Sequence, residues 1–196
     1  MTCHARIATY ILNTEISTPT LSGPSGIIAS TSATFTATDI GETATYAFYA
    51  SDGTLIRDFS SSNQITITST HNVTKSVKVR AKDNAGNVSG FSNTLSFTPD
   101  TVGPPTPTIS GPSGTITSLS ATYTASSAGA VYYQFQDDDA EVIQDWSTSN
   151  QITLTSTHGV RKRVKARAKD AVGNRSTNFS DYGSFTPDVV GPVAVV

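Results

Sequence analysis

The sequence repeats itself at a nearly constant interval, and this repeat constrains the fold more than any other feature. Four segments of the first half return in the second half with few changes. The matching pairs are residues 22–26 and 110–114, 62–71 and 149–158, 81–87 and 168–174, and 96–100 and 184–188. Self-similarity at a fixed period indicates copies of one folding unit in series. The chain is therefore expected to fold as two small domains of the same kind.

The interval between the copies changes twice by a single residue. It is 88 residues from Gly23 to Gly111, 87 from Asn63 to Asn150, and 88 from Phe97 to Phe185. The first slip lies between Thr38 and Tyr46, and the second lies between Asn87 and Phe91. A one-residue slip inside a strand would turn every following side chain to the opposite face. Both intervals are therefore predicted to be loops.

Apolar and polar residues alternate through most of each copy, which is typical of strands with one buried face. In the first copy the predicted buried residues are Ala33, Phe35, Ala37, Tyr46, Phe48, Ile65, Ile67, Val77, Val79, Ala81, Leu95 and Phe97. In the second copy they are Ala121, Tyr123, Ala125, Tyr133, Phe135, Ile152, Leu154, Val164, Ala166, Ala168 and Phe185. Gly23-Pro24 is expected to break the first strand, and Asp52-Gly53 predicts a hairpin. The predicted fold class is all-β, with two sandwiches in tandem.

The most specific segment of each copy is its final hairpin. Residues 79–89 read VRAKDNAGNVS, followed by FSNTL at 91–95 and TPDT at 98–101. This run resembles the last strands and linker of fibronectin type III modules, and of related bacterial Ig-like repeats in surface adhesins and extracellular glycoside hydrolases. Two features of the family pattern are missing, because Phe35 and Tyr123 replace its Trp, and Val77 and Val164 replace its corner Tyr. The resemblance implies two Ig-like (fibronectin type III-like) β-sandwich domains.

The repeat predicts five regions along the chain. They are an N-terminal segment at 1–17 with a strand at 7–12, a first repeat at 18–101, a proline-rich linker at 102–105, a second repeat at 106–189, and the start of a further repeat or an assembly strand at 190–196. A short proline-rich linker is stiff, so the domains are expected to form a rod. The ends permit two interpretations. One is a fragment of a longer array, and the other is a subunit whose terminal strand adds to a neighbour's sheet to build a filament.

Composition excludes some classes of function. Charged residues make up 14% of the chain and the formal net charge is −2, which argues against nucleic-acid binding. No segment approaches the roughly 18 apolar residues of a membrane span. The first residues, MTCHARI, lack the apolar region of a signal peptide. We expect an extracellular, cell-surface or virion location with no signal peptide in this chain.

The sequence indicates that the protein is not an enzyme. It contains no glycine-rich phosphate loop, no nucleophile elbow and no histidine cluster with metal-ligand spacing. Of the three histidines, His71 and His158 hold the same position in the two copies, which is typical of a residue at a turn or a strand end.

Oxygen-bearing side chains suggest a calcium site, because Ca²⁺ takes six to eight oxygen ligands. The candidates are Asp83, Asn87 and Asp100, with Asp170, Asn174 and Asp188 at the matching positions. Some adhesin repeats that this turn resembles bind calcium at domain junctions. The other interpretation is that Asp and Asn cap turns by bonding to their own backbone.

A row of cations is predicted on the outward face of the sixth strand of each copy. Lys78, Arg80 and Lys82 of the first copy become Arg163, Lys165, Arg167 and Lys169 in the second, and Arg161 extends the row. The row could bind an anionic glycan or an acidic partner, or it could pair with carboxylates on neighbouring strands. Two further candidates for partner contact are Trp146, which could instead plug a sheet edge, and the acidic run Asp137, Asp138 and Asp139.

The predicted function is a non-enzymatic structural or adhesion module, a rigid spacer or filament-forming subunit on a cell surface. The alternatives are a carbohydrate-binding accessory module of a secreted polysaccharide-degrading enzyme, and a virion or tail-fibre decoration domain. The expected partners are further copies or neighbouring repeats, and a surface glycan or protein. Contact with a specific partner is expected where the two copies differ.

Overall fold

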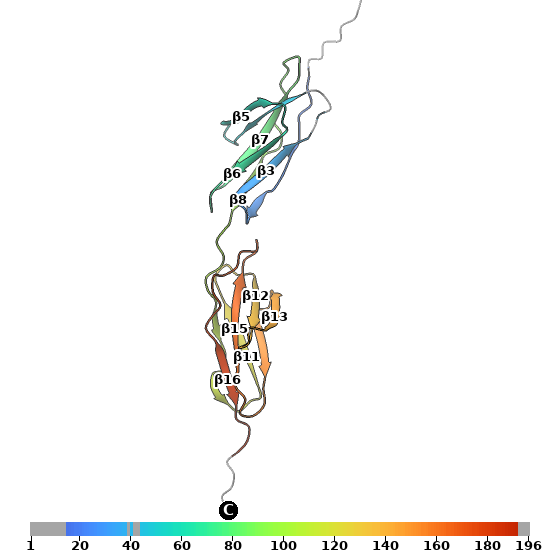
Figure 1. Cartoon of the computed structure of the whole chain (residues 1–196). Helices are drawn as coiled ribbons and strands as arrows, with labels where there is room; N and C mark the ends of the chain where they lie inside the picture. Colours follow the sequence, from blue (N-terminus) through green and yellow to red (C-terminus); the bar gives the residue numbers. More distant parts are fainter. Residues whose placement is uncertain (1–14, 39, 41–43, 192–196) are drawn as a thin grey trace, which may run out of the picture. The chain divides into compact units, whose positions relative to one another are not determined.

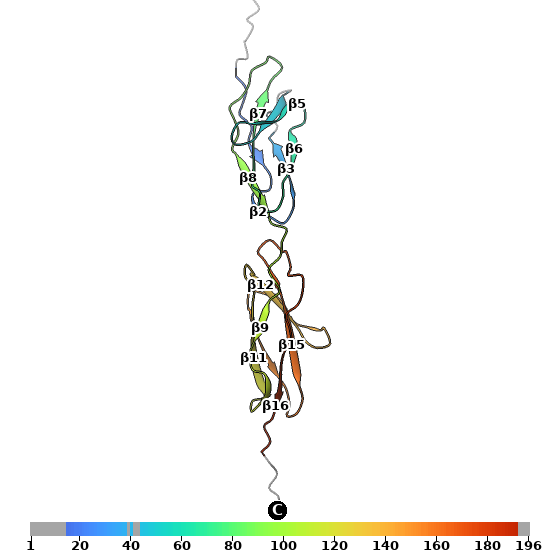
Figure 2. The same ribbon diagram turned by 90° about the vertical axis from the view of Figure 1, so that its left-hand side faces the viewer.

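The structure is a computed structural model that describes residues 15–38, 40 and 44–191. The chain divides into two compact units between Pro99 and Asp100. Each unit contains two β-sheets, and the described residues contain no helix (Figure 1). Figure 2 shows the two layers of each unit from the side, with β3 and β6 on one side of the first unit and β8 on the other. The all-β prediction is confirmed.

The first unit consists of eight strands. They are β1 (Leu21–Ser22), β2 (Gly26–Ile28), β3 (Ser32–Ala37), β4 (Thr45–Tyr49), β5 (Leu55–Ser60), β6 (Gln64–Thr68), β7 (Lys75–Lys82) and β8 (Leu95–Pro99). The smaller sheet has the order β1-β3-β6, and the larger sheet has the order β2-β8-β7-β4-β5.

The second unit repeats this arrangement strand for strand. Its strands are β9 (Thr108–Ser110), β10 (Gly114–Ile116), β11 (Ser120–Ser126), β12 (Tyr132–Gln136), β13 (Val142–Ser147), β14 (Gln151–Thr155), β15 (Lys162–Lys169) and β16 (Gly183–Pro187). The sheets have the orders β14-β11-β9 and β10-β16-β15-β12-β13. The sequence repeat therefore corresponds to a repeat of topology.

The first strand of each unit changes sheets part-way along its length. In the first unit β1 pairs antiparallel with β3, while β2 pairs parallel with β8. The break falls at Gly23-Pro24, as predicted, because Pro cannot donate to a ladder. A Cβ on Gly23 would lie 2.7 Å from the ring of Phe35, so the backbone can approach this ring as closely as it does only without a side chain.

Each unit has its own hydrophobic core between its two sheets. Most of the predicted core residues are buried, and Phe35, Phe48, Phe135 and Val164 are completely inaccessible. The apolar residues of β6 and β14 are only half-buried, because these strands lie at the edges of the smaller sheets. Ala47 is absent from the predicted buried residues, because alternation turns it outward between Tyr46 and Phe48, and it is nevertheless fully buried.

The predicted linker belongs to the second unit. Pro104 is buried, and the carbonyl of Pro105 accepts a hydrogen bond from Ser127 Oγ at 2.7 Å. The carbonyl of Asp100 accepts a hydrogen bond from Asn174 Nδ2 at 2.8 Å. These contacts place the start of the unit two residues before the predicted linker.

Some predictions lie outside the described residues. They are the strand at 7–12, most of the interval that contains the first slip, and residues 192–196 of the predicted further repeat or assembly strand at 190–196. The second slip lies in a segment with no named strand, between β7 and β8, which agrees with its prediction as a loop.

Candidate functional site

The long strand β7 is only partly covered by the last strand of its unit. β8 pairs with residues Lys75 to Val77, and further along β7 the backbone groups of Val79 and Ala81 need other partners. The same holds in the second unit, where β16 pairs with residues Lys162 to Val164 of β15. The segment that precedes the last strand satisfies these groups.

Two serines in each unit bind this part of the strand, and we call them the serine clamp. Ser92 donates its N–H to the carbonyl of Val79 at 2.9 Å, and its Oγ accepts the N–H of Val79 at 3.0 Å. Ser89 binds Ala81 in the same way, with 2.9 Å for both bonds. Each serine therefore replaces a strand neighbour with one backbone bond and one side-chain bond.

The clamp is repeated in the second unit despite the inserted residue. Ser180 binds Ala166 with bonds of 2.8 and 2.9 Å, and Ser176 binds Ala168 with bonds of 2.8 and 3.1 Å. The insertion falls between the two serines, since Ser176 stands 87 residues after Ser89 and Ser180 stands 88 after Ser92. The loop therefore absorbs the slip while both serines keep their partners.

The outward cations of β7 lie against aromatic rings, and we call this arrangement the cation–aromatic ladder. In the first unit Lys78 and Arg80 lie 4.4 and 4.5 Å from the ring centre of Phe91. Lys82 lies 4.5 Å from the ring centre of Phe59 on β5. Contacts of this kind stabilise by electrostatic attraction and by packing of the side-chain stems.

The ladder of the second unit is longer. Its contacts are Arg163 with Tyr182 at 3.9 Å, Lys165 with Phe179 and Tyr182 at 4.9 and 5.4 Å, Arg167 with Phe179 at 5.4 Å, Lys169 with Trp146 and Tyr132 at 4.7 and 4.9 Å, and Arg175 with Trp146 at 5.2 Å. Four rings and five cations therefore share the outer face of this sheet.

The ladder places the predicted cations together and shows what sequence reasoning missed. The cations of β15 do share one face, but the described ion pairs include only one from this row, between Arg163 and Asp138 at 3.3 Å. Rings take the place of the expected carboxylates. Trp146 is half-buried on this face beneath Lys169 and Arg175. The overlooked signal was the recurrence of Phe91 and Phe179 beside the clamp serines.

The candidate calcium ligands Asp83 and Asn87 form a turn cap. One carboxylate oxygen of Asp83 accepts the backbone N–H of Asn87 at 2.8 Å, and the other accepts the Asn87 side-chain amide at 2.9 Å. The amide of Asn87, followed by the backbone N–H groups of the turn, holds the pKa of Asp83 below its usual value.

The second turn has the same geometry. Asp170 accepts the backbone N–H groups of Val172, Gly173 and Asn174 at 2.8–3.0 Å, and its other oxygen accepts the Asn174 amide at 2.9 Å. Among residues 15–38, 40 and 44–191, no group of three or more His, Cys, Asp or Glu side chains could hold a metal ion. The geometry of both turns agrees with the turn-cap interpretation.

The acidic run also forms a turn, between β12 and β13. Asp137 Oδ1 accepts the N–H groups of Asp139 and Glu141 at 3.0 and 2.9 Å, and Ala140 has a positive φ of 62°. Asp138 reaches Arg163 on β15. This turn therefore lies beside the ladder, and Asp138 forms an ion pair with the first cation of the ladder, Arg163.

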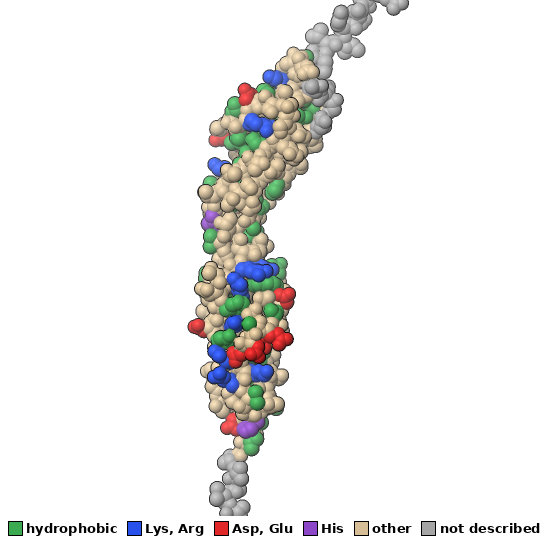
Figure 3. All heavy atoms as spheres, viewed as in Figure 1, with side chains coloured by type: hydrophobic (Ala, Val, Ile, Leu, Met, Phe, Trp, Pro, Cys, Tyr) green, Lys and Arg blue, Asp and Glu red, His purple; other side chains and the backbone are tan. Residues whose placement is uncertain are grey.

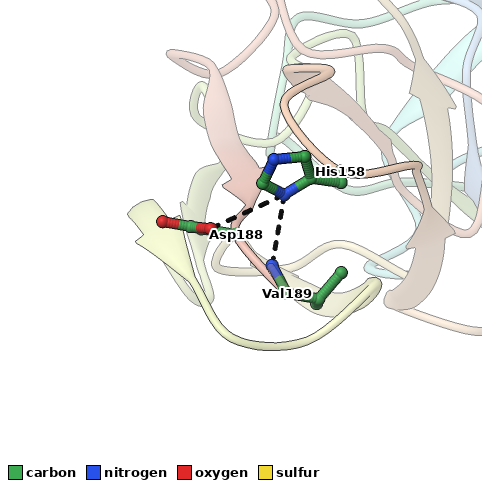
Figure 4. A network of polar contacts seen from close by, with 3 residues as sticks. All are labelled: His158, Asp188 and Val189. Carbon is green, nitrogen blue, oxygen red and sulfur yellow. Dashed lines mark hydrogen bonds and ion pairs between the residues drawn. The ribbon is translucent and has the colours of Figure 1, made fainter. Parts of the chain in front are cut away.

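His158 lies in the turn between β14 and β15, as expected for its position in the repeat. Its Nδ1 accepts the N–H of Val189 at 3.3 Å and lies 3.5 Å from Asp188 Oδ1 (Figure 4). These contacts hold the first residues after β16 against the domain. Asp188, a candidate metal ligand, is thus an ion-pair partner of the imidazole when that ring is protonated.

The grooves of the described surface carry few ionisable groups. One groove of about 590 Å³ lies beside β5 and β6, and Asp52 and Lys75 are the only charged residues that line it. Asp52 caps the predicted hairpin, because its Oδ1 accepts the N–H of Thr54 at 2.9 Å, and this bond lowers the pKa of Asp52. No helix that could cross a membrane occurs in the described part of the chain.

The chain is similar in structure to modules of known fold. It matches fibronectin(III)-like modules of Clostridium thermocellum CbhA with a TM-score of 0.51 and 18% sequence identity, over 86% of this chain and 94% of that one. The repeats have the fold of fibronectin(III)-like modules. The FN1–FN3 domains of chicken CNTN1 match with a TM-score of 0.48 and 15% identity, over 88% of this chain and 68% of that one. No protein-family model and no curated protein matches the sequence.

The fibronectin(III)-like fold confirms the resemblance drawn from the final hairpin. The strand pairing also separates this fold from a constant-type Ig domain. If β1 and β2 are counted as one interrupted first strand, β5 is the fourth strand. In a constant-type Ig domain the fourth strand joins the sheet of the first, second and fifth strands. Here β5 and β13 pair with β4 and β12 in the larger sheet. The serine clamp and the ladder lie on that larger sheet in both repeats.

Proposed function

We propose that this chain is a non-enzymatic structural module, a rigid spacer or filament-forming subunit of a cell surface or virion. The observation that carries the proposal is the clamp and ladder, which are built twice with the same partners. Their hydroxyls, cations and rings satisfy one another and the backbone. An arrangement of this kind stabilises a strand that would otherwise be half-paired.

The proposal is also supported by what surrounds the ladder. Each unit has a separate core, and the segment that leads into the second repeat is hydrogen-bonded to that repeat. The rings of the ladder lie under cations, which disfavours stacking on neutral sugars. An accessory role in binding a neutral polysaccharide is therefore less well supported than a structural role.

Mechanical unfolding of single molecules of the whole chain tests the proposal. We expect two separate unfolding events, each lengthening the chain by about 30 nm, because each repeat releases about 90 residues of about 3.3–3.6 Å each. A single event, or extension without a force peak, would contradict a load-bearing role. Sedimentation over a range of concentrations then separates the two forms, since a spacer stays monomeric and a filament subunit assembles.

A further inference from the structure

Positive charge is segregated within the second unit. All seven Lys and Arg residues of this unit lie between Arg161 and Arg175, whereas its nine Asp and Glu residues are spread from Asp100 to Asp188. Figure 3, in which β15 faces the viewer, shows blue side chains along much of this unit and a compact red group beside them. A unit with a net negative charge therefore presents one face rich in cations.

Among the described residues, Arg163 is the one cation of the ladder that forms an ion pair with a carboxylate. Lys165 lies against the rings of Phe179 and Tyr182, and Arg167 donates to the backbone carbonyls of Ser176 and Thr177 at 2.9 and 3.4 Å. Rings and carbonyls orient a cation without cancelling its charge. The field of these side chains therefore extends into solvent, where it attracts anions.

Two carboxylates limit the extent of this field. Asp138 pairs with Arg163 at one end of the row. Asp145 on β13 accepts hydrogen bonds from the N–H of Trp146 at 2.8 Å and from Gln134 at 3.1 Å. These bonds, followed by the charges of Lys169 and Arg175, lower the pKa of Asp145. Asp145 thus offsets part of the charge of Lys169 and Arg175, whereas the described partners of Lys165 and Arg167 are rings and backbone carbonyls.

This face is enlarged where the two copies differ. At positions that hold Thr45, Ser76, Val88 and Thr94 in the first repeat, the second repeat has Tyr132, Arg163, Arg175 and Tyr182. These differences add two rings and two cations to the same sheet face. Tyr182 is 36% exposed, so part of its ring is open to a ligand.

We propose that the ladder face of the second repeat binds an anionic polysaccharide. Carboxylate or sulfate groups would contact Lys165, Lys169 and Arg175, while a sugar ring lies against the exposed part of Tyr182. Residues on one face of a strand recur about every 7 Å, so cations and rings repeat along this face. A periodic surface of this kind suits a polymer that itself repeats ring and charge. This inference rests on the proposed structural function, but polysaccharide binding is measured separately from mechanical unfolding.

Calorimetric titration of the whole chain tests this partner. The probes are heparin, which is sulfated, polygalacturonate, which is carboxylated, neutral dextran and poly-glutamate. We expect the two anionic polysaccharides to bind, and to bind more weakly as salt screens the charges. The double variant K165Q/K169Q should lose roughly tenfold in affinity, whereas the matched variant K78Q/K82Q in the first repeat should change by less than about twofold.

Further variants and probes sharpen the result. Asp145→Asn removes a carboxylate from the face and should raise the affinity about two- to threefold. Thermal unfolding of every variant identifies any loss of fold. Equal losses in the two double variants would overturn the assignment to the second repeat, and tighter binding of poly-glutamate would identify an acidic polypeptide instead. No binding of either anionic polysaccharide would overturn the proposal and leave the mechanical test of the structural role unaffected.

Discussion

The two repeats keep the same clamp but fill their cores differently. The first repeat packs Phe35 beside Phe97, with ring centres 5.9 Å apart. The second has Tyr123 at the position of Phe35, and its hydroxyl donates to the carbonyl of Pro112 at 2.8 Å. Tyr123 lies beside Phe185, with ring centres 6.4 Å apart. The larger residue has been accommodated without a change of topology.

A second difference explains how the space was made. Leu95 of the first repeat corresponds to Gly183 in the second, and a Cβ on Gly183 would lie only 2.5 Å from the ring of Tyr123. Val79 similarly becomes Ala166 on the neighbouring strand. Buried positions therefore vary in compensating groups, since an interior at crystal-like packing density has no spare volume.

Substitutions at Gly183 and Tyr123 should have the largest effect on stability. We expect Gly183→Leu to destabilise the second repeat by about 3 kcal/mol, because the added side chain overlaps Tyr123. Adding Tyr123→Phe should restore part of the loss, as the pair then matches the first repeat. Denaturant unfolding followed by Trp146 fluorescence reports this repeat, since Trp146 is the only tryptophan of the chain. A double variant no more stable than Gly183→Leu alone would show that the two positions are not coupled.

Removing a clamp serine should have the next largest effect on stability. The loss should be similar in the two repeats. Ser89→Ala and Ser176→Ala each leave a buried backbone N–H without its side-chain acceptor, which costs about 1–3 kcal/mol. The measurement is denaturant unfolding followed by NMR, which resolves the two repeats. Ser25→Ala and Ser113→Ala, at exposed positions outside the clamp, serve as controls and should change stability by less than about 0.5 kcal/mol.

Replacing one ladder ring should cost less, about 0.5–1 kcal/mol. Phe91→Leu and Phe179→Leu keep an apolar side chain and remove the ring beneath the cations. If the contact is electrostatic as well as apolar, Lys78→Met combined with Phe91→Leu should cost less than the sum of the single variants. Additive losses in this double-mutant cycle would mean that the ring acts only through its volume.

The replacement of Phe35 by Tyr123 in the second repeat also predicts that the two repeats differ in stability at alkaline pH. Burial raises the pKa of Tyr123, so the folded repeat disfavours the phenolate more than the unfolded chain does. The stability that this provides is complete below the unfolded pKa, near 10, and is lost as the pH rises through the folded value. We expect the second repeat to weaken above about pH 10, and Tyr123→Phe to reduce that slope. The unfolding free energy measured by Trp146 fluorescence between neutral and alkaline pH checks this.

Calcium should have the smallest effect. Both oxygens of Asp83 and of Asp170 already accept N–H groups, so millimolar Ca²⁺ is expected to leave the melting temperature of both repeats unchanged. A site built from these residues would instead bind the folded state and raise the melting temperature. Differential scanning calorimetry with Ca²⁺ and with Mg²⁺ as the ionic control distinguishes the two interpretations of these turns.

Sequence reasoning predicted the core well and the outer face poorly. Strict alternation identified Phe35, Phe48 and Val79 as buried, because a strand with one wet face admits few other patterns. The same alternation assigned Ala47 to solvent, although it is fully buried beneath the outer face of the larger sheet. The partners of the outward cations were also missed, since Phe91 lies in a segment with no regular pattern.

The sequence alone determined that this protein is two copies of one all-β unit, where the first strand of each unit is interrupted, and which side chains form most of its cores. These properties depend on local alternation, turn residues and the repeat, all of which are visible in one dimension. Only the tertiary structure decided that serines replace a missing strand neighbour, that rings lie beneath the cations, and that Gly183 makes room for Tyr123. Those contacts join residues from different strands and loops, and their selection depends on three-dimensional packing rather than on sequence spacing.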